Sequence, residues 1–246
     1  MGERPSIKRG QRYLVYESLC RYNFAKGYCC QRNILDIGCG EGFGTALLAD
    51  SALKVFGIDY AGEAIAYAMS NLAKPNLVFL KMDCARLGFH DSRFDIITAF
   101  EIIEHLSNPE RFLSETSRVL KDNGLVIISS MQKHGGIKSN NPFHLKDYSR
   151  EELMNALSGY YKYVELYGTH CIRRINPFQQ FVMDRDHFGI SRSIRQRLRS
   201  GLISKIEKLV GTTPPEEVWE RDFVVTRSLT KAINIIAICS GKRLKI

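Results

Sequence analysis

The segment Ile34–Gly44 constrains the fold more than any other part of this chain. It begins with a short apolar stretch around Asp36, and glycines then occupy every second position from Gly38 to Gly44. Glycine lets the backbone turn tightly and approach a ligand closely, because it has no Cβ. The Ala- and Leu-rich residues 45–49 predict a helix, whose N-terminus offers free N–H donors. The segment therefore predicts a strand, a glycine loop and a helix that together cradle a nucleotide-like cofactor.

The spacing of these glycines excludes two common phosphate-binding loops. A dinucleotide fingerprint requires G-x-G-x-x-G, but its third glycine would fall on Phe43 or Thr45 when the count starts from Gly38 or Gly40. A phosphate loop requires a lysine after its last glycine, and none follows here. The chain instead contains the pattern Asp-x-Gly-x-Gly-x-Gly.

Further apolar stretches follow at intervals typical of alternating strands and helices. We expect strands over residues 54–59, 77–80, 94–100, 125–129 and 160–167, and a last strand over 232–238. Helices are expected between them, including 109–120 and a helix that Ser149 and Glu152 open as a capping box. Asp59 ends a strand roughly 20 residues after the glycine loop, where a carboxylate can accept hydrogen bonds from two ribose hydroxyls. The alternation predicts an α/β fold with a mostly parallel sheet.

This arrangement resembles the class I S-adenosylmethionine-dependent methyltransferases. Asp36–Gly42 matches their first motif. The region between strands four and five also matches, since it consists of Glu101–Leu106, the helix expected over 109–120, and Lys121–Gly124. The resemblance implies a Rossmann-like, doubly wound, seven-stranded and mostly parallel sheet. Its strand seven would be antiparallel, with a helical insert before it. The resemblance also implies S-adenosyl-L-methionine as the cofactor and methyl transfer as the activity.

The resemblance implies a set of cofactor-binding residues, which are Arg12, Tyr13, Asp36, Gly38, Gly40, Asp59, Tyr60, Asp83, Cys84 and Phe100. Asp36, Gly38 and Gly40 would shape the methionine end of the pocket, and Asp59 would bind the ribose. Arg12 or Tyr13, on a leading helix, would hold the cofactor carboxylate, as an arginine pairs well with such a group.

The remaining members of that set would surround the adenine. Asp83 with Cys84 would bind the base, and Tyr60 would stack on it. Phe100, at the end of the fourth strand, would lie beside the cofactor.

Several segments are most similar to bacterial-type methyltransferases of polysaccharide and glycolipid biosynthesis. They are Gln11–Leu14, Gly40–Ala49, Phe100–Leu106 and Asn141–Ser149. One departure concerns Ser129–Gln132, where that family has Ser-Thr-Pro-Asn. The expected reaction is O-methylation of a glycan or glycolipid hydroxyl.

Methyl transfer to a hydroxyl requires a group that removes a proton, and histidine is the usual choice near neutral pH. His105 follows the fourth strand and His144 follows the fifth, so both belong to the same sheet edge. Either residue can be the catalytic base. The alternative is structural, with His105 ordering its loop and His144 capping the next helix.

A second hypothesis uses the same residues as metal ligands. Glu101, Glu104, His105 and His144 have the ligand types of a divalent site. Their pattern resembles metal-dependent small-RNA 2′-O-methyltransferases and some quinone O-methyltransferases. The alternative function is thus metal-assisted O-methylation of a quinol or an RNA 2′-OH. A third hypothesis, a cofactor-binding protein without catalysis, predicts a damaged cofactor pocket, whereas the motifs here are intact.

The charge and the spacing of elements suggest four regions. They are an N-terminal helical cap over 1–32, a methyltransferase core over 33–169, a basic helical insert over 170–231, and the last strand and tail over 232–246. The net charge of +9 is uneven, with +4 in residues 1–30, −2 in 31–189 and +7 in 190–246. Basic ends favour an anionic partner such as a membrane surface, a charged glycan or nucleic acid, the last being the weakest candidate.

Residues 190–210 predict a basic amphipathic helix. Such a helix usually packs on its own domain, and the alternative is a contact with an anionic membrane surface. The chain has no 18-residue apolar run, its first ten residues are charged, and its seven cysteines are scattered. We therefore expect a cytoplasmic protein, with peripheral membrane contact as the alternative.

Overall fold

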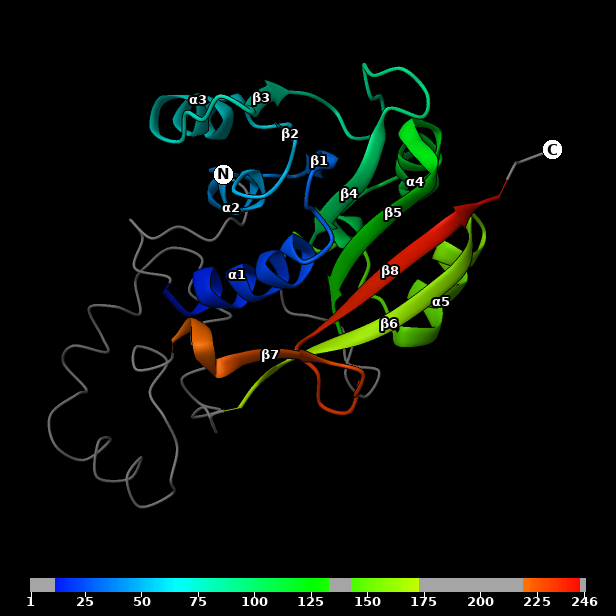
Figure 1. Cartoon of the computed structure of the whole chain (residues 1–246). Coiled ribbons are helices and arrows are strands. Elements are labelled where there is room, and N and C mark those ends of the chain that lie inside the picture. The colour runs from blue at the N-terminus through cyan, green and yellow to red at the C-terminus, as the bar shows by residue number, and fades with distance from the viewer. Residues whose placement is uncertain (1–11, 133–142, 173–218, 244–246) are drawn as a thin grey trace, which may run out of the picture.

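The eight strands of the computed structural model form one sheet in the order β3-β2-β1-β4-β5-β8-β6-β7 (Figure 1). The structure describes residues 12–132, 143–172 and 219–243. The parallel strands are β1 (Asn33–Ile37), β2 (Lys54–Asp59), β3 (Leu77–Lys81), β4 (Phe94–Phe100) and β5 (Leu120–Met131). The remaining strands are β6 (Tyr161–Cys171), β7 (Phe223–Thr226) and β8 (Asn234–Lys242). Strand β8 is antiparallel to both β5 and β6, and β7 is antiparallel to β6.

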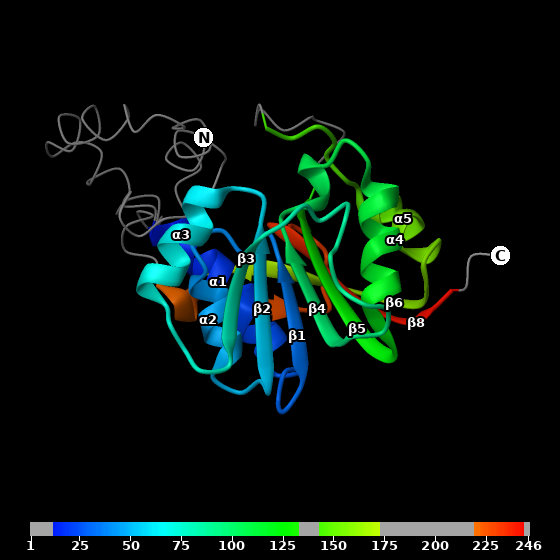
Figure 2. The same ribbon diagram turned by 90° about the horizontal axis from the view of Figure 1, so that it is seen from above.

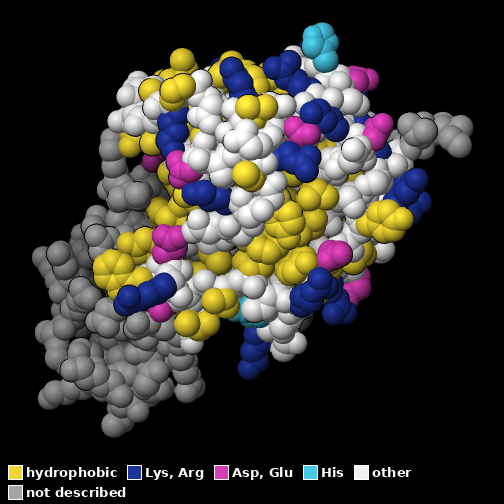
Figure 3. All heavy atoms as spheres, in the orientation of Figure 1, with side chains coloured by type: hydrophobic (Ala, Val, Ile, Leu, Met, Phe, Trp, Pro, Cys, Tyr) yellow, Lys and Arg dark blue, Asp and Glu magenta, His cyan; other side chains and the backbone are white. Residues whose placement is uncertain are grey.

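The helices cover the two faces of this sheet (Figures 1 and 2). Helices α1 (Arg12–Lys26), α2 (Phe43–Ala49) and α3 (Gly62–Asn71) lie on one face, and α4 (Pro109–Val119) and α5 (Arg150–Ser158) lie on the other. Two short 3₁₀ turns are η1 (Ile103–His105) and η3 (Glu220–Asp222). Figure 3 shows hydrophobic side chains gathered over β5 and β8, beyond the part of the first face that α1 covers.

Buried side chains alternate between the two faces, as the pleat of a strand requires. Ile34 of β1 packs with Leu48 of α2 in the layer under α1 and α2. Its neighbour Leu35 packs with Phe112 of α4 in the layer on the opposite face. Both faces of the central strands are therefore buried, which explains why these strands are apolar throughout.

The order of the strands reverses between β1 and β4, from which the chain winds outward in both directions. In open α/β sheets, a ligand crevice forms at the carboxyl ends of the strands on either side of such a reversal. This places the candidate site above the glycine loop after β1 and the segment after β4.

The fold class and the antiparallel last strand expected from the sequence are confirmed. The capping box is also present, since Ser149 and Glu152 each accept from the other's backbone N–H. The expected number of strands is wrong, because β7 adds an eighth strand within residues 170–231. Strand β6 extends to Cys171 and offers an open edge, with which Phe223–Thr226 pairs.

Strand β5 begins at Leu120 rather than at Leu125, because Leu120 already pairs with Phe94. The register then shifts, so that Lys121–Gly124 bulges out before Leu125 pairs with Ile96. The predicted basic helix over 190–210 lies outside the described residues. Within the part of the chain that the structure describes, no helix has the length and apolarity needed to cross a membrane.

Candidate active site

The glycine loop after β1 presents its backbone to the crevice. Gly38, Gly40 and Gly42 have φ angles of 72°, 55° and 82°, a conformation that glycine adopts at little cost. A Cβ on Gly38 would overlap the side chain of Ile102, and its N–H donates to the carbonyl of Ile58 at 2.8 Å. The tight turn thus requires glycine at Gly38, where the backbone conformation and the nearby Ile102 leave no room for a Cβ.

Asp59 ends β2 beside the glycine loop. Its Oδ2 accepts a hydrogen bond from the N–H of Gly40 at 2.9 Å, and its Oδ1 accepts one from the N–H of Ala61 at 2.8 Å. A carboxylate offers about four acceptor positions, so both oxygens can also receive hydroxyls of a ligand. The next residue, Tyr60, is 76% exposed, and its stacking on a ligand stays a prediction.

Asp83 and Cys84 follow β3, at the same edge of the sheet. Asp83 is exposed and accepts from the N–H of Ala85 at 2.8 Å. Cys84 is half-buried, and burial raises the pKa of its thiol to about 11. Neither residue lines the cavity described below, so their contact with an adenine stays a prediction.

Asp36 is fully buried beneath the glycine loop and shapes the crevice only indirectly. The hydroxyl of Thr45 donates to it at 2.6 Å, that of Thr98 at 2.7 Å, and that of Tyr22 at 3.1 Å. Burial raises the pKa of Asp36 to about 6, against the opposing effect of these three hydroxyls. The Tyr22 ring, which this acid holds, packs edge-on against Phe100 with ring centroids 4.9 Å apart.

A cavity of about 200 Å³ lies between the glycine loop, α1 and the segment after β4. The predicted residues that line it are Gly38, Gly40, Asp59, Phe100, His105 and His144. The residues of α1 that line it are Leu14, Glu17, Ser18, Arg21 and Tyr22. A leading helix over the pocket was expected from the sequence, but these residues were not singled out, although the charged pair Glu17 and Arg21 at i,i+4 spacing was a visible signal.

The predicted carboxylate-binding residues Arg12 and Tyr13 have side chains that lie outside the described residues. Arg21, from the same helix, reaches the cavity instead and is only 4% exposed. Its guanidinium contacts Glu17 at 2.8 Å and the side-chain oxygen of Asn234 at 3.0 Å. The cavity therefore contains one buried guanidinium that is held in place from two sides.

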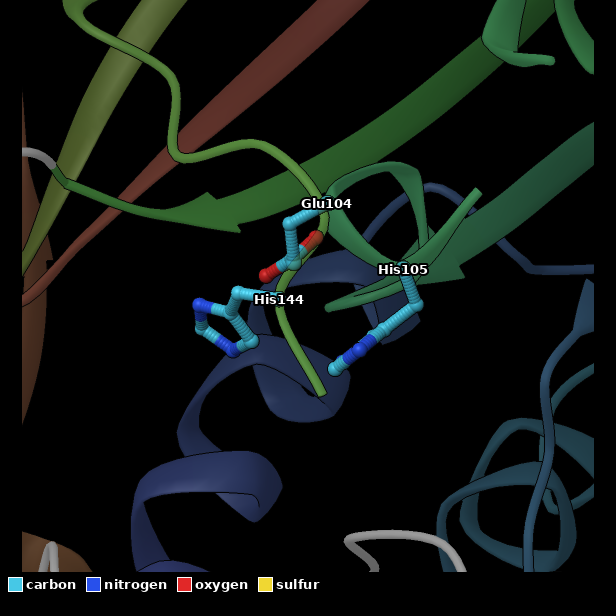
Figure 4. Close-up of side chains that lie close together, drawn as sticks. All are labelled: Glu104, His105 and His144. Carbon is cyan, nitrogen blue, oxygen red and sulfur yellow. The ribbon is translucent and has the colours of Figure 1, made fainter. Parts of the chain in front are cut away.

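Glu104, His105 and His144 converge at the rim of this cavity (Figure 4). One side-chain ligand atom from each lies within 4.8 Å of the others, and the two imidazole rings are 4.9 Å apart. His105 belongs to η1, and His144 lies in the segment between β5 and α5. Glu101 is not part of this group, so three of the four residues named in the metal hypothesis lie together.

The surroundings of this group orient each member. His105 Nδ1 is 2.9 Å from the carbonyl of Phe143, and His144 Nδ1 is 2.9 Å from the carboxylate of Asp147. Since both partners are acceptors, each Nδ1 carries the proton, and each Nε2 is the nitrogen with the lone pair. Burial, followed by the nearby charge of Glu101, raises the pKa of Glu104 well above its usual range.

Comparison with known proteins identifies relatives for part of this chain. Residues 35–128 match the family model described as a methyltransferase domain. A probable S-adenosylmethionine-dependent methyltransferase of Mycobacterium tuberculosis is 34% identical over 133 residues, which cover 52% of this chain and 48% of that protein. A ubiquinone biosynthesis O-methyltransferase of Glaesserella parasuis is 32% identical over 112 residues, which cover 42% of this chain and 46% of that protein.

The chain spans about half the length of the curated relatives it matches. A solved structure from Thermotoga maritima, described as a SAM-dependent methyltransferase and possible histamine N-methyltransferase, covers 96% of both chains with a TM-score of 0.65 and 16% identity. That likeness concerns the fold. The matched segment 35–128 includes the glycine loop, Asp59 and His105, whereas α1 and His144 lie outside it.

Proposed function

We propose that this protein is an S-adenosylmethionine-dependent methyltransferase. The observation that carries the proposal is the joint lining of one cavity by the left-handed glycines of the loop, the Asp59 carboxylate and the Phe100 ring. Gly38 and Gly40 line the cavity without a Cβ, which lets a ligand approach the backbone of the loop closely. Asp59 would hold the ribose hydroxyls, and when bound the cofactor supplies a sulfonium methyl that needs no further activation.

The geometry around His105 supports transfer to a hydroxyl oxygen. Its Nδ1–H donates to a backbone carbonyl, so the lone pair is on Nε2, and the residue lines the cavity. Such a nitrogen can remove the proton of an acceptor hydroxyl, and general-base catalysis contributes about 10²–10⁴-fold. The similarity to a ubiquinone biosynthesis O-methyltransferase supports oxygen as the methylated atom. A glycan or glycolipid as the acceptor stays a prediction from sequence resemblance.

Binding of S-adenosylhomocysteine tests the cofactor assignment by calorimetry. We expect the wild type to bind, and Asp59→Asn to bind at least about tenfold more weakly, since each lost charge-assisted hydrogen bond costs about 1.5–3 kcal/mol. Asp122→Asn is the matched control, because the side chain of Asp122 is 89% exposed on another part of the sheet. A wild type that does not bind overturns the proposal, and unchanged binding by Asp59→Asn overturns the assignment of the ribose site.

A second candidate function is metal-assisted O-methylation, which the group Glu104, His105 and His144 favours. Glu104 is 1% exposed, and its Oε2 has no hydrogen-bond partner among the described residues. Each imidazole is oriented by a backbone carbonyl or a carboxylate, as metal-binding histidines commonly are. A divalent ion held there would offset the buried charge of Glu104 and would lower the pKa of an acceptor hydroxyl.

Transfer of labelled methyl from S-adenosylmethionine into a fractionated cell extract distinguishes the two candidates. With His105 as the base, chelator leaves labelling unchanged, and His105→Ala slows transfer while S-adenosylhomocysteine still binds. With a metal, chelator abolishes labelling, and Mg²⁺ or Mn²⁺ restores it. Electron paramagnetic resonance of Mn²⁺ with the wild type and Glu104→Gln checks the ion directly, because only the wild type should bind it.

The labelled fraction also identifies the acceptor class. Label in a lipid or glycan fraction supports the predicted glycolipid acceptor, and label in a quinol or in RNA supports the alternatives. Incorporation into no fraction by a protein that binds the cofactor product supports the third hypothesis, a binding protein without catalysis.

A further inference from the structure

Glu101, the first residue after β4, has a strained backbone. Its φ of 55° lies in the left-handed region, which costs a residue with a Cβ about 1–2 kcal/mol. Its N–H donates to the carbonyl of Ser129 at 3.1 Å, which holds the strained turn against β5. Glycine would relieve the strain but would remove the side chain. Strained residues of this kind concentrate at functional sites, and Glu101 lines the cavity.

Two donors hold the side chain of Glu101 in one position. The hydroxyl of Ser129 donates to Oε1 at 2.6 Å, and the amide of Asn234 donates to Oε2 at 3.0 Å. Each carboxylate oxygen can accept a second hydrogen bond, so the group keeps acceptor capacity for a ligand. Two fixed partners also remove the rotamer entropy that ordering a free glutamate would cost.

Asn234 connects this carboxylate to the guanidinium of Arg21. Its Oδ1 accepts from Nη1 of Arg21 at 3.0 Å, while its Nδ2 donates to Glu101. Asn234 is 1% exposed and begins the apolar strand β8. We call these contacts the Asn234 bridge. A direct arginine–glutamate pair would engage both carboxylate oxygens, whereas the interposed amide occupies one lone pair of one oxygen.

The helix side of the bridge carries two charged groups, Arg21 and Glu17. Arg21 is charged at all accessible pH values, and Glu17 offsets part of that charge from the same helix. Glu104 lies nearby as well, and burial, followed by the charge of Glu101, keeps its pKa high. The site thus contains a carboxylate that two donors hold in place and that lines the cavity.

We infer that Glu101 orients the acceptor by accepting a hydrogen bond from it, and that Asn234 is the residue that positions Glu101. This inference rests on the proposed function and goes further, since it names the acceptor chemistry: a molecule with a hydroxyl or ammonium donor that Glu101 binds. His105 lies four positions further on, at the same end of β4 and in the same cavity. Glu101 therefore binds and orients, while His105 takes the proton.

The test measures the transfer of labelled methyl into the extract fraction that the wild type labels. A dilution series of that fraction gives the apparent kcat/KM. Glu101→Gln and Asn234→Asp should each lower the apparent kcat/KM at least about tenfold, the loss expected for one charge-assisted hydrogen bond. Binding of S-adenosylhomocysteine should stay within about twofold, because neither residue is assigned to the cofactor. Asn108→Asp is the matched control, since Asn108 caps α4 and aspartate caps equally well.

The double variant Glu101→Gln with Asn234→Asp separates positioning from simple structural support. It exchanges donor and acceptor, so the hydrogen bond between positions 101 and 234 can form again. Thermal stability should recover toward that of the wild type, and transfer should not, because the cavity has lost its carboxylate at position 101. Full transfer by the double variant, or by Glu101→Gln alone, overturns the inference.

Failure of the proposed function gives a different result, because the wild type then labels no fraction or does not bind S-adenosylhomocysteine. Treating the labelled product with nitrous acid, which destroys primary amines, distinguishes an ammonium donor from a hydroxyl donor. Either donor is consistent with Glu101 as the acceptor-orienting residue, and a product with neither donor contradicts it.

Discussion

Replacing Asp36 with Asn should make the stability of this protein less dependent on pH. Asp36 is fully buried, and three hydroxyls donate to its carboxylate. Burial is the largest influence, and it raises the pKa of the group to about 6. Asparagine has nearly the same shape and carries no charge, so Asp36→Asn removes the titration while keeping the volume.

The sign follows from the raised pKa. The folded protein binds the proton of Asp36 more tightly than the unfolded chain, whose aspartates titrate near 3.9. The contribution of this group to stability is therefore fully present below about pH 4 and is lost as the pH rises through about 6. The difference between the two pKa values corresponds to about 3 kcal/mol, at about 1.36 kcal/mol per unit.

Urea unfolding followed by circular dichroism, at pH values from about 4 to about 8, measures this effect. The free energy of unfolding of the wild type, relative to Asp36→Asn, should fall by about 2–3 kcal/mol over that range. Asp122→Asn is the control, because its exposed carboxylate should show no such change.

A constant difference between wild type and Asp36→Asn would refute the reasoning, because burial would then not govern this carboxylate. A difference of opposite sign, in which the wild type gains stability as the pH rises, would mean that the hydroxyls of Thr45, Thr98 and Tyr22 outweigh burial. The pKa would then lie below its usual value.

Three other substitutions test the loop, the core and a helix cap. Gly38→Ala puts a Cβ against Ile102 at positive φ, so calorimetry should show at least about tenfold weaker binding of S-adenosylhomocysteine. Gly62→Ala should bind normally, because its Cβ would make only an ordinary contact, 3.5 Å from the Lys81 side chain. Phe112→Ala empties a fully buried site and should lower the free energy of unfolding by about 3–5 kcal/mol in urea; a loss under about 1 kcal/mol would contradict the packing. Ser149→Ala should cost about 1 kcal/mol in the same assay, and Ser149→Asp should restore most of it.

Local patterns were sufficient for most of the fold. The glycine loop, the strand after it and the capping box at Ser149 each depend on residues within a few positions of one another, and the structure has all three. Strand β7 was missed because Phe223–Thr226 is short and becomes a strand only by pairing with the end of β6. A pairing partner some 50 positions away leaves no periodic signal in the segment itself.

The candidate site was predictable where strand ends supply it, whereas the leading helix was expected at the pocket without Arg21 being singled out. Asp59 and His105 follow strands, and parallel strands bring their carboxyl ends together. Arg21 contacts Asn234 across 213 positions of sequence, a contact that no local pattern indicates. The asparagine itself was a signal, since one amide within the apolar run 232–238 must find partners when it is buried.

The absence of Glu101 from the group of Glu104, His105 and His144 also has a structural cause that the sequence does not show. Sequence order placed Glu101 and Glu104 on one short turn, which suggested that both face the same ion. The positive φ of Glu101 turns its side chain toward Ser129 and Asn234 instead. A single backbone angle thus gives two neighbouring acids different partners.

The pairing of β6 with β7 joins the two ends of residues 173–218. Cys171 pairs with Phe223, and the N–H of Ile172 donates to the carbonyl of Asp222 at 2.8 Å. Halving or doubling the length of a segment closed in this way changes its closure entropy by only about 0.6 kcal/mol. Trp219, which follows the end of this segment, also contacts the helix that lines the cavity, because its ring stacks on Tyr16 of α1. A change in the length of residues 173–218 therefore leaves both fixed ends in place, one at the edge of the sheet and the other beside the helix that lines the cavity.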